Sequence, residues 1–168
     1  MRTDENAVDF VVAWVDGNDP EWQRRKNKRL GLPDSDVREA RYRDWDLLRY
    51  WFRGVEAFAP WVRKVHFICD QEPPAWLNAE EEKLHVTRHE DFIPARFLPT
   101  FSSHPIELNS FRIPGLSSRF VYFCDDMYLI RPMKETDFFR KGLPVDCAGL
   151  NRGLVALIRI SPGAFPAQ

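Results

Sequence analysis

The chain has 168 residues, of which 44% are hydrophobic and 14% aromatic, and its formal net charge is −1. This length suits one domain with a buried core, and the composition excludes an intrinsically disordered chain. The balanced charge argues against bulk electrostatic binding to nucleic acid, so we expect no nucleic-acid partner. The apolar run over residues 10–15 is too short for a signal peptide or a membrane span, which favours a cytoplasmic location.

The first part of the chain predicts a strand, a polar loop and a helix. Residues 8–15 (VDFVVAWV) are typical of a strand because they are β-branched and lack a helical period. The loop that follows is rich in turn residues, and Asp19 is placed to cap a helix over residues 20–30, with Pro20 in its first position. Backbone N–H groups at a helix start favour anions, so the loop is a candidate for phosphate or ribose contacts, although most such loops only connect.

Apolar residues at helical spacing predict a second helix, which Asp44 is placed to cap and which Pro60 ends. Arg49 and Arg53 lie four residues apart on its other side. They are either surface charges or phosphate contacts, and Arg49 also has Asp46 within reach as a partner. The pattern favours core positions for Trp51 and for Trp14 on the first strand.

Two further strands are predicted over residues 62–70 and 84–88. His89 follows the second of them, and without a nearby second His or Cys it favours a surface or hydrogen-bonded histidine over a metal ligand. A helix is then expected from about residue 100 to 113, and its polar positions are Glu107, Asn109 and Arg112.

The stretch RFVYFCDDMYLIR, residues 119–131, predicts a buried strand that ends abruptly in two carboxylates, Asp125 and Asp126. Two adjacent anions at a strand end cost desolvation energy unless a cation compensates, and ligands of α/β sheets bind at such ends. A divalent metal that bridges to a diphosphate explains the pair. The alternative is a simple turn, with one aspartate capping and the other solvated. Cys69 and Cys124 lie in apolar runs, where a free cysteine behaves as a small hydrophobe.

The order of elements predicts an α/β fold of the Rossmann-like kind, with a mixed, mainly parallel sheet flanked by helices. A helical turn over residues 135–139 and a strand over residues 145–150 are expected to complete the sheet.

Three long strings resemble the first two motif regions of the Stealth family of sugar-phosphate transferases. AWVDGNDPEW (residues 13–22) resembles the first motif, and YRDWDLLRYWFRGVEAFAPWVRKVHFICD (residues 42–70) resembles the start of the second. HEDFIPARFLPTFSSHPIELNSFRIPGLSSRFVYFCDDMYLIRPM (residues 89–133) continues it. The family includes bacterial capsular polysaccharide phosphotransferases and the α/β subunit of the GlcNAc-1-phosphotransferase that tags lysosomal glycoproteins.

The resemblance implies transfer of a sugar-1-phosphate from a UDP-sugar such as UDP-GlcNAc to a hydroxyl of a glycan acceptor, with release of UMP, in the synthesis of cell-surface polysaccharide. It implies that Asp125 and Asp126 hold Mg²⁺ or Mn²⁺ and that Asp16 or Asp126 is the catalytic base. The nucleotide-sugar would be bound by a further set of residues: Trp14, Gly17, Arg49, Glu107, Asn109 and Arg112.

The chain also departs from the family pattern. Cys124 stands where members usually carry Asn, and Phe111 stands where many carry His. The third and fourth motifs have no match before Gln168, so we expect residues 1–150 to be the N-terminal portion of the family domain and residues 151–168 to be a divergent or truncated tail. The alternatives left open are an inactive nucleotide-sugar-binding fragment, a chain completed by a second polypeptide or associated peripherally with the inner membrane, and a metal-dependent glycosyltransferase that releases UDP.

Overall fold

The computed structural model of the protein describes residues 7–31 and 46–145. Its main feature is a sheet of four parallel strands in the order β3-β2-β1-β4. The strands are β1 (Val8–Ala13), β2 (Val65–Ile68), β3 (Leu84–Thr87) and β4 (Arg119–Phe123). Residues up to Glu135 form one compact unit, and residues from Thr136 form a second. The predicted α/β fold with a mainly parallel sheet is confirmed.

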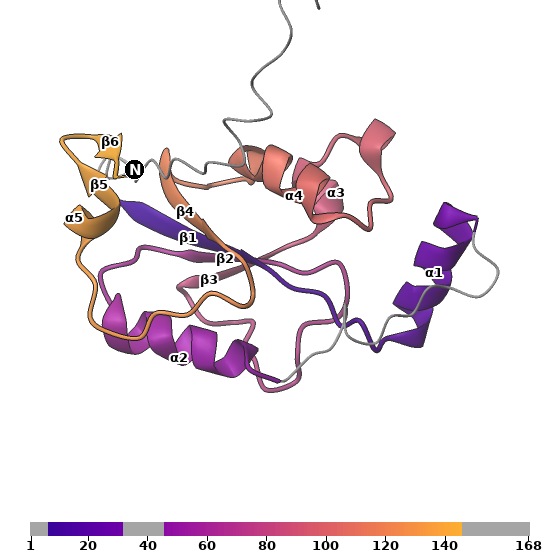
Figure 1. Cartoon of the computed structure of the whole chain (residues 1–168), viewed down its shortest axis with the longest axis horizontal. Coiled ribbons are helices and arrows are strands. Elements are labelled where there is room, and N and C mark those ends of the chain that lie inside the picture. The colour runs from indigo at the N-terminus through magenta and orange to yellow at the C-terminus, as the bar shows by residue number, and fades with distance from the viewer. Residues whose placement is uncertain (1–6, 32–45, 146–168) are drawn as a thin grey trace, which may run out of the picture. The chain divides into compact units, whose positions relative to one another are not determined.

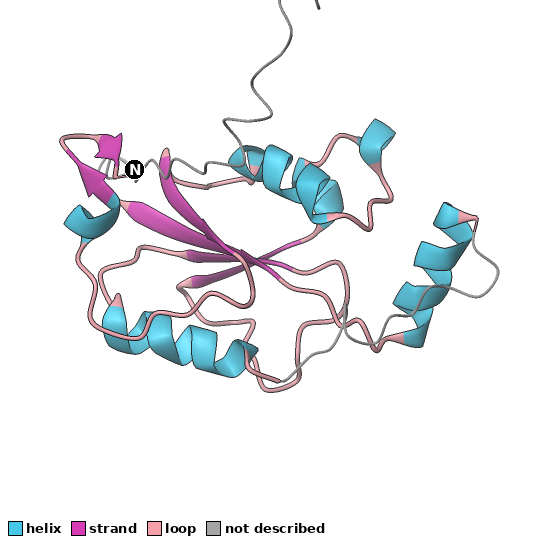
Figure 2. Ribbon diagram, in the orientation of Figure 1, coloured by secondary structure: helices cyan, strands magenta, loops and turns pink. Residues whose placement is uncertain are grey.

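Helices flank this sheet on both faces (Figures 1 and 2). Helix α2 (Leu48–Phe58) covers one face, and α3 (His89–Phe92) and α4 (Ser103–Asn109) cover the other. Because both faces are covered, the central strands β1 and β2 are buried along nearly their whole length, and they are apolar except for Asp9 and His66. Among the helices of the described part of the chain, none combines the length and the apolar character needed to cross a membrane.

Helix α1 (Pro20–Leu30) begins and ends as its sequence predicts. The Asp19 side chain accepts a hydrogen bond from the Glu21 N–H at 2.8 Å, and Pro20 occupies the first helical position. Gly31 ends the helix in the left-handed conformation, with φ of 66°.

Two helices differ from the prediction. Helix α2 begins at Leu48 without a side-chain cap, and the predicted cap Asp44 lies outside the described residues. The helix expected up to residue 113 stops at Asn109 and continues as a 3₁₀ turn, Ser110–Arg112. The side chain of Asn109 donates to the Pro105 carbonyl at 2.8 Å, so a side chain competes with the backbone where the helix tightens.

The second unit also differs from what was expected. After the short helix α5 (Glu135–Phe138), the chain forms an antiparallel hairpin of β5 (Phe139–Arg140) and β6 (Leu143–Pro144). The sequence pattern did not indicate this hairpin. Of the strand predicted over residues 145–150, Val145 is irregular and the rest lies outside the described residues, as does the predicted boundary at residue 150.

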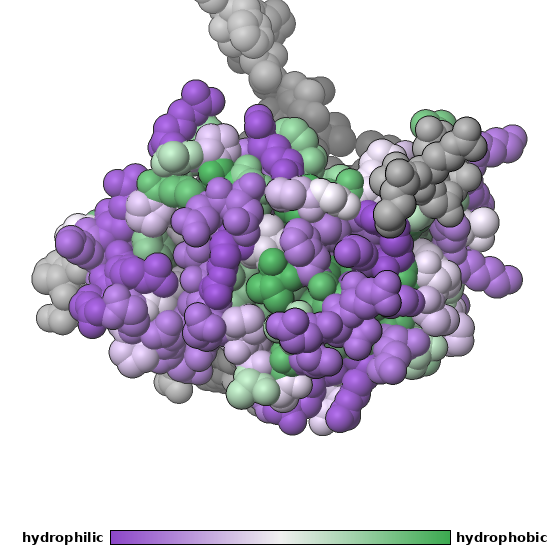
Figure 3. Space-filling view, turned by 180° about the vertical axis from the view of Figure 1, so that it is seen from behind, coloured by the Kyte–Doolittle hydropathy of each residue, from purple (hydrophilic) through white to green (hydrophobic). Residues whose placement is uncertain are grey.

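The core lies on both faces of the sheet. On the α2 face, Phe10 packs against Phe123 with ring centroids 4.8 Å apart, and Trp51 packs against Phe123 at 5.5 Å. Trp51 is 1% exposed, as expected of a core residue. The opposite face is built on a cluster of buried residues from the sheet, α3 and the approach to β4: Val11, Ile68, Phe92, Ile93 and Ile113. The surface seen from behind is mainly hydrophilic, with hydrophobic side chains gathered near its centre (Figure 3).

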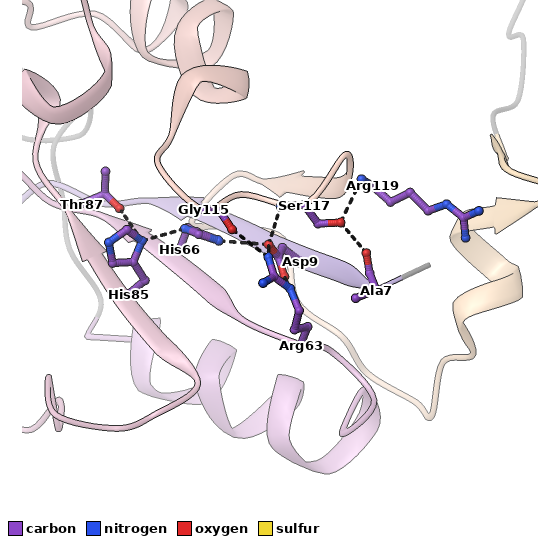
Figure 4. A network of polar contacts seen from close by, with 9 residues as sticks. All are labelled: Ala7, Asp9, Arg63, His66, His85, Thr87, Gly115, Ser117 and Arg119. Atoms are coloured by element: carbon purple, nitrogen blue, oxygen red, sulfur yellow. Dashed lines mark hydrogen bonds and ion pairs between the residues drawn. The ribbon is translucent and has the colours of Figure 1, made fainter. Parts of the chain in front are cut away.

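A network of polar side chains connects neighbouring strands on the face of the sheet that α3 and α4 cover (Figure 4). Asp9 of β1 is fully buried and accepts hydrogen bonds from Arg63 Nε at 2.9 Å and from the Ser117 N–H at 2.8 Å. His66 Nε2 lies 3.1 Å from the same carboxylate, and His66 Nδ1 lies 2.9 Å from Nδ1 of His85. Since Asp9 contacts both the approach to β2 and the approach to β4, it fixes β4 beside β1.

Candidate functional site

The strand order places the loops after β1 and β4 side by side. From β1 the chain proceeds outward to β2 and β3, and β4 then pairs with the other side of β1. Val12 is the register partner of Phe123, so both parallel strands end at the same edge of the sheet. Ligands of open α/β sheets bind at this kind of reversal in strand order. The loop after β1 carries Asp16, and the turn after β4 carries Asp125 and Asp126.

The acidic pair occupies the tip of a tight turn. The Met127 N–H donates to the Cys124 carbonyl at 3.1 Å, and the Tyr128 hydroxyl donates to the Asp125 carbonyl at 3.0 Å. Both aspartates are exposed. The prediction that this pair suffers a desolvation cost is therefore wrong, because water screens the two charges. The backbone therefore forms the simple turn that was the alternative prediction. The two carboxylates are exposed and can be reached by a ligand.

The strand before the pair is also less buried than predicted. Only Phe123 of β4 is buried, because within the described sheet β4 is an edge strand that pairs with β1 alone. Cys124 is exposed, so its expected role as a buried hydrophobe is wrong, whereas Cys69 is fully buried as expected. Burial raises the pKa of the Cys69 thiol to about 11.

Negative charge accumulates around the end of β4. Burial raises the pKa of Tyr122, and the charges of Glu107, Cys124 and Asp125 raise it further. Burial also raises the pKa of the Cys124 thiol, with further contributions from Asp126, Glu107 and Asp125. Glu107 of α4 thus acts on Cys124 together with Asp125 and Asp126, and on Tyr122 together with Asp125. The structure brings these three carboxylates into one electrostatic neighbourhood.

The donor set fits a hard divalent cation that is shared with a substrate. In the described ranges, no three His, Cys, Asp or Glu side chains are grouped closely enough to hold a metal ion by themselves. Mg²⁺ is commonly bound through one or two carboxylates together with phosphate oxygens and water. Two accessible aspartates, Asp125 and Asp126, meet that requirement if a diphosphate supplies the other ligands.

The loop after β1 is held by Gln71, a residue that the sequence analysis did not single out. Its side chain accepts from the Asp16 N–H at 2.8 Å and donates to the Asp16 carbonyl at 3.1 Å and to the Asp19 carboxylate at 2.7 Å. Asp16 Oδ1 in turn accepts from the Asn18 N–H at 2.8 Å. Gly17 is buried in this loop, and Trp14 packs on Phe67 with centroids 6.0 Å apart. The backbone around Asp16 is therefore fixed before any ligand binds.

Replacing Gln71 by alanine is expected to loosen this loop. The change removes three hydrogen bonds to a side chain that is 8% exposed, so we expect a loss of about 1–3 kcal/mol in the free energy of unfolding. Urea denaturation followed by tryptophan fluorescence measures this loss. The control is Gln23→Ala, which removes one hydrogen bond, to the Gly17 carbonyl, and should cost less. Equal stability of Gln71→Ala and the wild type would contradict the assigned role.

The remaining predicted site residues make local contacts. Arg49 pairs with Asp46, the partner that the sequence offered, and its guanidinium lies 5.7 Å from the ring centre of Trp76. Arg112 is exposed with its guanidinium over the ring of Phe111. Asn109 uses its side-chain amide on the Pro105 carbonyl. The loop that carries Asp16 and the turn that carries Asp125 and Asp126 thus follow neighbouring parallel strands, while Arg49 lies against Trp76 in the connection from β2 to β3.

His89 is largely buried and lies near a carboxylate. Its Nδ1 lies 3.7 Å from Asp70, whose carboxylate also lies 3.8 Å from Arg25. Burial lowers the pKa of His89, and Asp70 opposes that effect. This position links the ends of β2 and β3 with α1.

Comparison with known families decides the relationship. Residues 7–32 match Stealth protein CR1, conserved region 1, and residues 41–145 match Stealth protein CR2, conserved region 2. The chain belongs to the Stealth family. The two Stealth regions contain both loops of the sheet edge described above, so the resemblance noted in the sequence is confirmed.

The curated relatives of this chain include polysaccharide phosphotransferases of streptococci. The receptor polysaccharide phosphotransferase WefC of Streptococcus oralis is 52% identical over 144 residues, which cover 83% of this chain and 43% of the relative. The capsular polysaccharide phosphotransferase WcwK of Streptococcus pneumoniae is 50% identical with the same coverage. CpsJ of Streptococcus thermophilus, a capsular polysaccharide phosphotransferase, is 49% identical over 136 residues, or 57% of its length. The chain therefore spans about half the length of these relatives.

Proposed function

We propose that this Stealth chain carries the donor-binding half of a sugar-1-phosphate transferase that acts in capsular or exopolysaccharide synthesis. The supporting observation is that the Asp16 loop and the Asp125–Asp126 turn follow two neighbouring parallel strands, β1 and β4, at the reversal of strand order. The names of relatives about 50% identical to it point to the same chemistry. The donor would be a UDP-sugar, and the acceptor a hydroxyl of the growing glycan.

In the proposed reaction, the acceptor oxygen attacks the sugar-proximal phosphorus of the donor. A new phosphorus–oxygen bond forms, the bond between that phosphorus and the bridging diphosphate oxygen breaks, and UMP leaves. Asp16 is our first choice to accept the hydroxyl proton, because its backbone is fixed by Gln71 at the same edge of the sheet. Asp126 remains the second choice.

Asp125 and Asp126 would hold Mg²⁺ or Mn²⁺ together with the diphosphate. When bound, such a cation neutralises the phosphate charge. Trp14 and Gly17, in the loop after β1, are proposed to line the nucleotide-sugar pocket. From α4 and the turn after it, Glu107 and Asn109 would orient the sugar, and Arg112 would contact a phosphate. Arg49, in the first turn of α2, remains a proposed phosphate contact if the bound nucleotide-sugar reaches that helix.

The nucleotide product distinguishes this proposal from its main alternative. The chain is incubated with UDP-GlcNAc, Mn²⁺ and an oligosaccharide acceptor, alone and together with an extract that supplies any missing polypeptide, and nucleotides are separated by anion-exchange chromatography. We expect UMP to be released in proportion to phosphodiester formed. Release of UDP would instead identify a glycosyltransferase, and donor binding without either product would identify a binding fragment.

A further inference from the structure

A groove lies between α2 and the start of β3, which is an edge strand of the described sheet. It has a volume of about 580 Å³ and lies between α2, the connection from β2 to β3, and the residues that precede these two strands. We call it the α2–β3 groove. The proposed chemistry at the carboxyl edge of β1 and β4 does not use it.

Positive charge is concentrated in this groove. Its lining contains four cations, Arg49, Arg53, Lys64 and Lys83, and two acids, Glu56 and Glu81, although the whole chain has a net charge of −1. Lys83 is held in place by donating to the Pro60 carbonyl at 3.0 Å. The Nε of Arg49 is buried and has no hydrogen-bond partner in the described part of the chain. The excess of two cations over acids in its lining therefore favours an anionic ligand.

An aromatic ring forms part of the same wall. Trp76 lines the groove and is 38% exposed, and the ring of Phe52 meets it at 6.0 Å with an interplanar angle of 70°. Arg49 also lies against this ring. A tryptophan held by two neighbours and still open to solvent offers a flat surface on which the C–H face of a sugar ring can pack, because the face of an aromatic ring is electron-rich.

The groove extends along the sheet from one edge to the other. Lys64 and Lys83 directly precede β2 and β3, so they mark the amino edge. Helix α2 ends just before β2 and runs back along the sheet, which puts Arg49, in its first turn, toward the carboxyl edge (Figure 1). That end of the groove lies at the edge that carries Asp125 and Asp126, on the opposite side of β1. A chain of several sugars can lie along it with one end toward the acidic turn.

We propose that the α2–β3 groove binds an acidic segment of the oligosaccharide acceptor, with a sugar ring on Trp76 and carboxylate or phosphate groups at Arg49, Arg53 and Lys64. This inference rests on the proposed function for the identity of the acceptor. The groove itself requires only that the ligand combine sugar rings with negative charge. Neutral glycans lack the charge, and free phosphate lacks the ring.

Calorimetric titration of the 168-residue chain with a hyaluronan tetrasaccharide, in the absence of any nucleotide, tests the proposal. Chitotetraose is the neutral control, and inorganic phosphate is the anion without a ring. We expect the acidic tetrasaccharide to bind at least about tenfold more tightly than either control. Its affinity should fall as the salt concentration is raised. No binding at millimolar concentration, equal binding of chitotetraose, or equal binding of phosphate would overturn the proposal.

Variants locate the binding on the protein. Arg53→Glu is expected to lower the affinity for the tetrasaccharide about fivefold or more. Lys28→Glu makes the same charge change at an exposed position of α1 and should leave that affinity unchanged. Trp76→Ala should weaken it about tenfold, and Trp76→Phe should restore most of the affinity because a ring remains. Equal effects of Arg53→Glu and Lys28→Glu would overturn the location. Since no donor and no turnover are involved, this result stands or falls separately from the release of UMP.

Discussion

Replacing both Asp125 and Asp126 by asparagine is expected to abolish metal-dependent binding of UDP-sugar without unfolding the protein. Both side chains are exposed at the tip of a turn, so the fold does not depend on their charge. Asparagine keeps the shape but removes two negative charges from a site that has no third protein ligand grouped with them in the described ranges. We expect the affinity for UDP-GlcNAc in Mn²⁺ to fall at least about 100-fold.

The matched control for this change is Glu80→Gln with Glu82→Gln, which removes two exposed charges from the connection between β2 and β3. Calorimetric titration with UDP-GlcNAc in the presence of Mn²⁺ and of EDTA compares the three proteins. The control should bind as the wild type does. An aspartate variant that retains wild-type, Mn²⁺-dependent affinity would remove the acidic pair from the site.

Replacing Asp9 by alanine is expected to cost about 3–5 kcal/mol in the free energy of unfolding, which is the largest effect on stability that we predict. The fully buried carboxylate accepts hydrogen bonds from Arg63 and Ser117 and faces His66. Its removal leaves these donors unsatisfied between β1, β2 and β4. Chemical denaturation at pH 7 measures the loss.

Asp9→Asn is the companion variant, because it keeps the side-chain volume and one acceptor oxygen while it removes the charge. Its free energy of unfolding should fall less than that of Asp9→Ala. The surface variant Asp137→Ala, in the second unit, is the control and should change stability by less than about 0.5 kcal/mol. Wild-type stability in Asp9→Ala would show that the network does not fix β4 beside β1.

The same network predicts how stability depends on pH. Burial alone raises the pKa of Asp9, but hydrogen bonds from His66, Arg63 and the Ser117 N–H outweigh it and hold that pKa below its ordinary value of 3.8. The stability that Asp9 supplies is therefore fully present above pH 3.8 and is lost as the pH falls through the lower, folded-state pKa.

His85 acts at higher pH. Burial lowers its pKa from the ordinary value of 6.5, and the neighbouring His66 and Lys64 lower it further. As the pH falls below 6.5, the unfolded state takes up a proton that the folded state resists, so stability decreases from that point. His89 has a pKa lowered in the same direction and adds to this loss. Part of the slope between pH 7 and pH 5 should therefore disappear in His85→Gln.

Much of the fold could be predicted because its signals are local. The apolar run of β1, the Asp19 cap and the proline after it define the first strand and helix within a few residues. The break after Asn109 was missed, because it depends on a side chain that bonds to the Pro105 carbonyl rather than on the apolar period. The hairpin of the second unit is too short to produce an alternating pattern.

The site was predictable in part for the same reason. Carboxylates at strand ends stand out in the sequence, so Asp16, Asp125 and Asp126 could be predicted to follow strands of the sheet. Gln71 was missed because its partner Asp16 lies 55 positions away, and nothing local marks the contact. Asp9 had a usable signal, a lone carboxylate inside an apolar strand, which implies a buried partner. The contact between Arg49 and Trp76, and with it the α2–β3 groove, arises only when α2 packs beside the connection from β2 to β3.

Paramagnetic relaxation by Mn²⁺ in the NMR spectrum of the ¹⁵N-labelled protein, with UDP-GlcNAc present, tests most directly whether the two loops share one metal and one diphosphate. We predict that amide signals of residues 14–19 and 124–127 broaden together and that both recover in Asp125→Asn/Asp126→Asn. Broadening centred on Asp70 and His89, or confined to one of the two loops, would contradict the account.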